Sequence, residues 1–280
     1  MSATKVWLNG ALVAAEDAVV PVNNHGLTVG DGMFETMKVV DGTAFAVRRH
    51  LARLQRSAHG LGLEVPYGDG ALRDAIESTV DANQPDAGWV RVTVTGGAGP
   101  GGSSRGSERA TVVIQCGAAT RWSDAAAVVT VPWPRNERGA LAGLKTTSYA
   151  ENVVARERAA AAGAEEALFG NTVGNLCEGT GSNIFVVRDG RLSTPPLASG
   201  CLAGVTRELL LDPVLGLAVV EGDTAMTLLV DVEEAFLTSS TRDVQPVASI
   251  DERALPSCPG PMTMAARDAF AALQTRDLDP

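Results

Sequence analysis

The sequence predicts an α+β fold in which helices pack on sheets. Apolar stretches of strand character and stretches of helical periodicity follow one another without strict alternation. Turn dipeptides such as Asn9-Gly10 and Asp41-Gly42 mark hairpins, which consist of antiparallel strands. The length of 280 residues corresponds to about two domains, at roughly 150 residues per domain.

The first predicted domain covers residues 1–120. Residues 6–13 form a hairpin closed by Asn9-Gly10, and residues 33–47 form a second hairpin closed by Asp41-Gly42. Apolar residues recur at helical spacing from Leu51 to Leu61, which predicts a helix over residues 49–60. The rest of the domain is predicted as a helix over residues 71–82, strands over 89–95 and 110–115, and a glycine-rich loop over 96–106.

The second predicted domain covers residues 121–280 and follows a polar stretch of small residues at 117–127. The dipeptide Asp189-Gly190 predicts a third hairpin, between strands over residues 183–187 and 191–193. Further strands are predicted over residues 128–131, 166–169 and 235–238, and helices over 153–162, 205–211 and 262–273.

The composition excludes several classes of protein. The net charge is −10 and the pI is near 4.8, whereas proteins that bind nucleic acid or an anionic membrane carry a basic excess. No apolar run approaches the roughly 18 residues of a membrane helix, and the first residues lack the apolar region of a signal peptide. The cysteines are far apart and form no CxxC pair, which is typical of reduced thiols in a cytoplasmic protein: Cys116, Cys177, Cys201 and Cys258.

Two motifs in the glycine-rich loop lack the context that their chemistry requires. Residues 97–102 read G-x-G-x-x-G, but a strand rather than a helix follows, which excludes a dinucleotide site. Residues 102–106 read G-x-S-x-G, yet an α/β-hydrolase needs a histidine later in the chain, and His25, His50 and His59 all precede this serine. These histidines also lack the spacing of a metal site, so we expect no metal, and His25 alone stays a candidate site residue.

Three segments contain the residue types that a pyridoxal-phosphate site needs. Lys145 is one of three lysines among 23 basic residues, and a lysine, unlike an arginine, can lose its proton and form a Schiff base. Glu178 lies in a glycine-rich bend, where a carboxylate can keep a pyridine nitrogen protonated. At Val205-Thr206 a bend of small residues enters a helix, whose first N–H groups suit a phosphate. Taken one at a time, a surface lysine and a solvated glutamate are the alternatives.

Ordered matches to one enzyme group run through nearly the whole chain, at residues 25–36, 50–54, 143–149, 178–185, 204–207 and 238–247. On these stretches the chain resembles the fold-type IV pyridoxal-phosphate enzymes, which comprise branched-chain aminotransferases, D-amino-acid aminotransferases and aminodeoxychorismate lyases. The resemblance implies two α/β domains, the second with a barrel-like sheet, and pyridoxal 5'-phosphate in the cleft between them. It also implies a homodimer, in which a loop of one subunit closes the site of the other.

The resemblance implies a role for each matched residue. Lys145 is expected to form the Schiff base and to act as general acid and base, while Glu178 is expected to pair with the pyridine nitrogen. Tyr149 lies near the position of the family's tyrosine beside the cofactor. The residues implied for the cofactor phosphate are Arg53 on a helix, the helix-start pair Val205 and Thr206, and Ser240 and Thr241 in a second loop.

Within the family, the resemblance favours aminodeoxychorismate lyase. This enzyme converts 4-amino-4-deoxychorismate, a small anionic substrate, to 4-aminobenzoate and pyruvate in folate precursor synthesis. Thr36 occupies a place where the lyases carry threonine, and it is expected to be catalytic; residues 134–145 are also similar to the lyases. The alternative is an aminotransferase acting on D-amino acids, branched-chain amino acids or amines. Arg91 matches the arginine of the branched-chain signature, although Val92 replaces its proline, and Arg105 is displaced from the place of the D-amino-acid enzymes' arginine.

Overall fold

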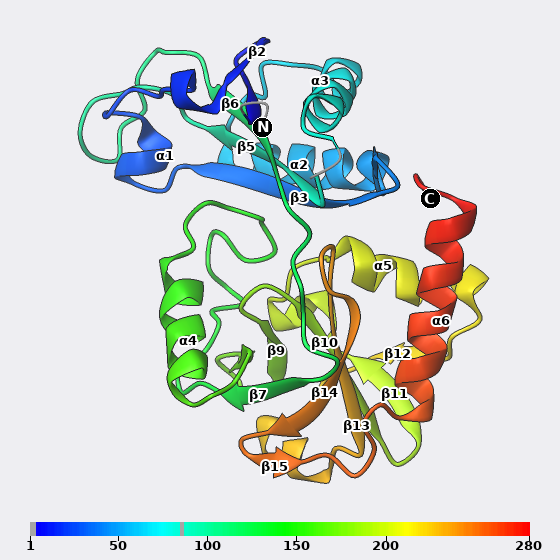
Figure 1. The fold of residues 1–280 in the computed structure, drawn as a ribbon. Helices are drawn as coiled ribbons and strands as arrows, with labels where there is room; N and C mark the ends of the chain where they lie inside the picture. The colour runs from blue at the N-terminus through cyan, green and yellow to red at the C-terminus, as the bar shows by residue number, and fades with distance from the viewer. Residues whose placement is uncertain (1–3, 85–86) are drawn as a thin grey trace. The chain divides into compact units, whose positions relative to one another are not determined.

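The computed structural model describes residues 4–84 and 87–280, which divide into two compact units (Figure 1). Unit 1 consists of the described residues of Met1–Thr120, together with Leu144–Tyr149 and Asp277–Pro280. Unit 2 consists of Arg121–Gly143 and Ala150–Arg276. The short segment that contains Lys145 therefore belongs to unit 1.

Unit 1 is built on a six-stranded antiparallel sheet with the order β2-β1-β6-β5-β3-β4. The first predicted hairpin is confirmed, because Asn9 and Gly10 both take the positive φ that a two-residue turn between strands requires. The strands are β1 (Lys5–Leu8), β2 (Ala11–Ala14), β3 (Gly32–Val40), β4 (Thr43–Ala44), β5 (Trp89–Thr95) and β6 (Thr111–Gly117).

The second predicted hairpin is confirmed as β3–β4, but its second strand is shorter than predicted. Ala46 has a left-handed φ of 58°, so the chain turns there, and helix α2 (Val47–Leu61) begins directly afterwards. The predicted core positions Leu51, Leu54 and Ala58 are at most 3% exposed. The helix α3 (Asp69–Ala82) contributes to the same core, and both helices cover one face of the sheet. Two short helices, η1 (Ala15–Asp17) and α1 (His25–Thr28), precede β3.

Unit 2 is built on a nine-stranded mixed sheet, with the path β12-β11-β10-β13-β14-β7-β8-β9 and with β15 paired to β14. A tight turn at Thr180-Gly181 joins β9, at one end of the path, to β10 within it, so the sheet curls into a half barrel. The barrel-like sheet that the resemblance implied is thus confirmed. The strands are β7 (Ala126–Thr130), β8 (Glu166–Gly170), β9 (Leu176–Gly179), β10 (Asn183–Arg188), β11 (Arg191–Thr194), β12 (Val219–Glu221), β13 (Glu234–Ser239), β14 (Asp243–Ile250) and β15 (Arg253–Ala254).

Three α-helices accompany this sheet. The helix α5 (Val205–Leu211) has the predicted bounds, whereas α4 (Ala150–Ala161) and α6 (Pro261–Arg276) begin three residues and one residue before their predicted starts at 153 and 262. Short 3₁₀ helices are η2 (Leu197–Ser199), η3 (Pro213–Leu215) and η4 (Met226–Asp231). Among the residues that the structure describes, no helix is both long enough and apolar enough to span a membrane.

Candidate functional site

Lys145 is fixed by backbone contacts to strand β3 and helix α2 in unit 1. Its carbonyl oxygen accepts a hydrogen bond from Phe34 N at 3.1 Å, and Thr147 N donates to Gly32 O at 2.8 Å. Its own backbone N–H donates to Ser57 Oγ of α2 at 3.1 Å. Its ammonium nitrogen, Nζ, lies 4.3 Å from the centre of the Phe34 ring. The sheet thereby presents the Lys145 amine on the face that bears Phe34.

This face of the sheet, opposite the helices, brings several predicted residues together. Thr36 follows Phe34 by two residues on β3 and so points to the same side, and Arg91 lies directly opposite Thr36 on β5. The Arg91 guanidinium carbon lies 3.7 Å from the centre of the Phe34 ring, and the Tyr149 ring meets Phe34 edge-on at 5.3 Å. Burial lowers the pKa of Arg91. Among the described residues, no carboxylate is paired with this arginine.

The other face of β3 carries a buried carboxylate, Glu35, which the sequence analysis missed. Both of its oxygens bind Arg53 of α2, at 2.8 Å from Nε and 2.7 Å from Nη2, and Oε2 also lies 2.7 Å from His50 Nδ1. Burial by itself raises the pKa of Glu35, but Arg53 and His50 outweigh it and lower the pKa to about 2. A usable signal was its alternation with Met33 and Met37, which places an acidic residue on the core side of a strand.

Arg53 is thereby a buried residue of 4% exposure, not a solvated one on the outside of α2. Glu35 occupies its Nε–Nη2 edge and orients the guanidinium. A contact between Arg53 and the cofactor phosphate stays a prediction.

We expect the Arg53→Ala substitution to weaken the affinity for pyridoxal phosphate by about tenfold to a hundredfold, the equivalent of one charge-assisted hydrogen bond. Arg53→Lys should recover part of it, because a point charge replaces a planar fork. Titration of the cofactor-free protein measures the affinity, and the free energy of unfolding is measured in parallel, because Arg53→Ala also leaves Glu35 without its arginine. Arg56→Ala, on the exposed side of the same helix, is the control. Equal affinities of the Arg53→Ala and Arg56→Ala variants would contradict the phosphate assignment.

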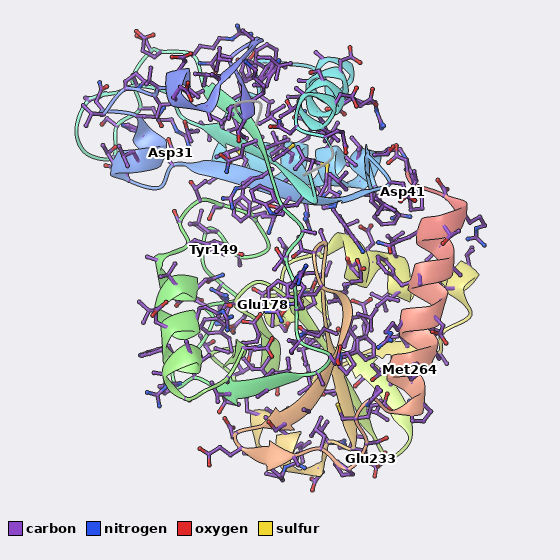
Figure 2. The ribbon with its side chains drawn as sticks, in the orientation of Figure 1. Asp31, Asp41, Tyr149, Glu178, Glu233 and Met264 are labelled. Atoms are coloured by element: carbon purple, nitrogen blue, oxygen red, sulfur yellow. The ribbon has the colours of Figure 1, made fainter. Side chains whose placement is uncertain are left out.

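Glu178 lies on β9 of unit 2 (Figure 2), and both oxygens of its side chain have partners. Oε2 accepts a hydrogen bond from Leu202 N at 2.9 Å, and Oε1 lies 3.4 Å from Arg135 Nε. Arg135 lies over the Phe169 ring, 4.2 Å from its centre, and is also paired with Glu151 at 2.6 Å. The two contacts hold the Glu178 carboxylate in place, and a carboxylate can keep a pyridine nitrogen protonated.

The predicted helix start at Val205-Thr206 is present, because α5 begins at Val205. Gly204 caps α5 without a side-chain hydrogen bond, and a Cβ atom at Gly204 would overlap Asn183 Oδ1, so a larger residue there would displace the Asn183 side chain. Thr238 lies directly opposite Asn183 in the β10–β13 pair. Its Oγ1 is buried and has no hydrogen-bond partner among the described residues, as expected of a group whose partner is a ligand.

Ser240 and Thr241 lie in the short turn between β13 and β14, next to Thr238. The carbonyl oxygen of Thr241 accepts a hydrogen bond from Trp122 Nε1 at 2.9 Å, which fixes the turn from outside. Val205 and Thr206 lie at a helix start and Ser240 and Thr241 in a turn, whereas Thr36 lies within β3 and Arg53 within α2. The amine, the carboxylate and the hydroxyl and N–H donors fit pyridoxal phosphate. Unit 1 contains Lys145, Thr36, Arg53 and Tyr149, and unit 2 contains Glu178, Val205, Thr206, Ser240 and Thr241.

Arg105, in the loop after β5, has its donors engaged inside unit 1. Nε and Nη2 bind the two oxygens of Asp31 at 2.8 and 2.7 Å. Nη2 and Nη1 also donate to the last carbonyls around the end of α2, at Leu61 and Gly62. The hydrogen bonds from Arg105 lower the pKa of Asp31, to which His25 also contributes. These contacts fix the glycine-rich loop to Asp31 and to the end of α2.

Comparisons with known proteins place the chain among aminotransferases. The family described as Amino-transferase class IV matches residues 32–250. A D-alanine aminotransferase of Bacillus licheniformis is 29% identical over 95% of each chain, and a branched-chain-amino-acid aminotransferase of Pseudomonas aeruginosa is 29% identical over 95% of this chain and 91% of that one.

Solved structures agree with this placement. The branched-chain aminotransferase of Thermoproteus uzoniensis with norvaline has a TM-score of 0.89 and 30% identity, over 97% of this chain and 95% of that chain. The T.th. branched-chain amino acid aminotransferase complexed with N-(5'-phosphopyridoxyl)-L-glutamate has a TM-score of 0.90 and 28% identity, over 99% and 96% of the two chains.

Proposed function

The chain belongs to the class IV aminotransferase family, and we propose that it is a transaminase acting on branched-chain amino acids. It is a pyridoxal-phosphate-dependent enzyme. The comparisons support the aminotransferase alternative of the sequence analysis better than its preferred aminodeoxychorismate lyase, because the relatives and solved structures described above are named as aminotransferases. The choice of branched-chain substrates follows the Pseudomonas, Thermoproteus and T.th. proteins.

One observation in this chain supports a substrate that bears a carboxylate. Arg91 is a largely buried cation on the sheet face that also bears the Lys145 amine, and no carboxylate of the described residues neutralises it. A guanidinium binds a carboxylate through two parallel hydrogen bonds, and burial strengthens them. We assign Arg91 to a carboxylate of the amino acid or keto acid. The rings of Phe34 and Tyr149 provide apolar surface beside it.

We propose a role in amino transfer for each predicted site residue. When bound, the cofactor supplies an electron-accepting ring that stabilises negative charge on the substrate carbon bearing nitrogen. Lys145 removes the proton from that carbon and returns a proton to complete the transfer. Glu178 holds a proton at the pyridine nitrogen, with Arg135 and the Leu202 N–H fixing its carboxylate. Tyr149 and Thr36 border the reacting groups on the Lys145 side. The phosphate is assigned to Arg53, Val205, Thr206, Ser240 and Thr241.

The D-amino-acid alternative has weaker support in this chain. In the D-amino-acid enzymes the sequence resemblance implied a carboxylate-binding arginine in the loop after β5. That loop contains two arginines here: Arg105 donates to Asp31 and to carbonyls at the end of α2, and Arg109 donates to the carbonyl oxygen of Pro66. A role in substrate binding would require these contacts to break.

The test offers the purified protein, loaded with pyridoxal phosphate, three classes of substrate. We expect keto-acid formation from L-leucine, L-isoleucine and L-valine with 2-oxoglutarate as acceptor. D-Alanine with the same acceptor tests the D-amino-acid alternative, and 4-amino-4-deoxychorismate tests the lyase by release of pyruvate. Release of pyruvate from the last compound without amino transfer from any amino acid would overturn the proposal in favour of the lyase.

The same assay tests the role of Arg91. Arg91→Gln should lower kcat/KM for the amino acid by about tenfold to a hundredfold, as expected for the loss of a charge-assisted contact to a carboxylate. The matched control is Arg109→Gln, because Arg109 is an exposed arginine of unit 1 that also lies over an aromatic ring, that of Tyr67. Equal kcat/KM values for the two variants would remove Arg91 from the substrate site.

A further inference from the structure

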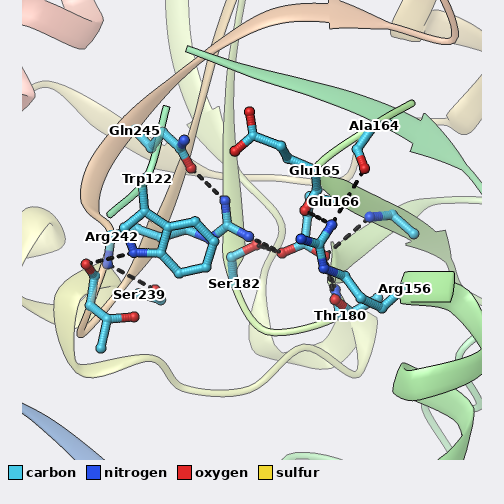
Figure 3. Close-up of polar contacts among 12 residues, drawn as sticks. Trp122, Arg156, Ala164, Glu165, Glu166, Thr180, Ser182, Ser239, Arg242 and Gln245 are labelled. Atoms are coloured by element: carbon cyan, nitrogen blue, oxygen red, sulfur yellow. Dashed lines mark hydrogen bonds and ion pairs between the residues drawn. The ribbon is translucent and has the colours of Figure 1, made fainter. Parts of the chain in front are cut away.

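A buried ion pair in unit 2 joins strand β8 to the turn between β13 and β14 (Figure 3). Nη2 of Arg242 lies 3.1 Å from Oε2 of Glu166, and the two side chains are 4% and 1% exposed. Taking two charges out of water is costly, so a buried pair is a poor source of stability. The further hydrogen bonds of Glu166 and Arg242 indicate the role of this ion pair.

On the Glu166 side, the contacts run to the turn between β9 and β10. Thr180 donates to Oε1 of Glu166 through its backbone N at 3.0 Å and also through its hydroxyl, and the Ser182 hydroxyl donates to Oε2 at 3.0 Å. Thr180 comes two residues after Glu178, and Ser182 immediately precedes Asn183. Glu166 therefore fixes the turn that links Glu178 to the residue packed against Gly204 at the start of α5.

On the Arg242 side, the contacts hold the Ser240–Thr241 turn. The Arg242 guanidinium lies 3.7 Å from the centre of the Trp122 ring and donates to the side-chain oxygen of Gln245. The same indole donates through Nε1 to the carbonyl oxygen of Thr241 at 2.9 Å. The backbone N–H of Arg242 donates to Ser239 Oγ at 3.2 Å. Arg242, the residue directly after Thr241, therefore anchors the turn to the sheet and to Trp122.

We propose that Glu166 and Arg242 are positioning residues, which hold the Ser240–Thr241 turn in the shape that binds the cofactor phosphate and tie it to the turn that follows Glu178. The inference rests on the assignment of Ser240 and Thr241 to the phosphate in the proposed function. Neither residue is assigned a contact with the cofactor. They act through Thr241 on one side and Thr180 on the other.

The test compares two ligands that differ in the phosphate alone. The full-length protein, freed of cofactor, is titrated with pyridoxal phosphate and with pyridoxal, and the ratio of the two dissociation constants measures what the phosphate contributes. We expect Arg242→Met to weaken the affinity for pyridoxal phosphate by about tenfold to a hundredfold. The affinity for pyridoxal should change by no more than about threefold, so the two dissociation constants become more nearly equal. A general loosening of the fold would weaken both ligands alike and would overturn the inference.

A second variant keeps the test decisive if Arg242→Met alone fails to fold. Glu166→Gln with Arg242→Met removes both charges, so no buried charge is left without its partner, and we expect the same change in the ratio. Arg188→Met is the control, because it removes an exposed ion pair of the same unit, with Asp189, and should keep the ratio. An unchanged ratio in both Arg242 variants would overturn this inference alone. A wild-type protein that binds the two ligands equally would instead overturn the phosphate assignment of the proposed function, and this inference with it.

Discussion

Lys145→Ala is expected to abolish amino transfer. The lost acid–base step alone should lower kcat by about 10² to 10⁴-fold, and the residue that attaches the cofactor is lost as well. Lys145→Arg should be as inactive, although it keeps a cation near the Phe34 ring, because an arginine in a protein does not give up its proton. Turnover of the amino acid that proves best in the substrate panel is the measurement.

Lys38 provides the matched control for Lys145. It lies on the same face of β3, four residues after Phe34, and Lys38→Ala should keep turnover within a few fold. Borohydride reduction of the wild-type protein followed by peptide mapping should find the cofactor on Lys145. A label on Lys5 or Lys38, or full activity of Lys145→Arg, would show that the assignment of the reactive lysine is wrong.

Local signals predicted much of the fold. The hairpins at Asn9-Gly10 and Asp41-Gly42 depend on turn chemistry within two residues, and α5 begins after a glycine where the sequence indicated it. The helix starts were less accurate, because the start of α2 depends on the left-handed Ala46, whose N–H donates to the carbonyl oxygen of the distant Leu278. The strands β9, β12, β14 and β15 were not predicted. β9, β12 and β15 have four, three and two residues, which are too few for a periodic pattern, and β14 contains Pro246, a residue that interrupts the pattern of a strand.

The site was predictable as a set of residue types and not as a set of contacts. The unusual lysine and the glycine-rich bends pointed to Lys145, Glu178 and Val205. The groups that hold them come from distant parts of the chain: Ser57 for Lys145, and Leu202 and Arg135 for Glu178. Such pairings depend on tertiary structure, so no local pattern marks them. Glu35 was the exception, since a carboxylate on the apolar side of a strand already calls for a buried cation.

Glu178→Gln is expected to lower kcat by on the order of 10²-fold, as when an enzyme loses one charged group that stabilises its transition state. The amide is isosteric, so the hydrogen bond from Leu202 N can persist, while the negative charge near the pyridine nitrogen is lost. That nitrogen then keeps its proton less well, and the ring accepts electrons less readily. The affinity for pyridoxal phosphate should change little, because the phosphate contacts are assigned to other residues.

The fold should tolerate this substitution, because Arg135 keeps a second carboxylate partner, Glu151, at 2.6 Å. The same pairing supplies the control. Glu151→Gln removes a carboxylate from Arg135 and leaves Glu178 in place, and its side chain is half exposed, so kcat should stay within a few fold. Measured together, kcat and the dissociation constant of the cofactor separate the two roles of Glu178. If Glu178→Gln keeps full activity, Glu178 is a structural partner of Arg135 and the proton on the ring nitrogen is held elsewhere.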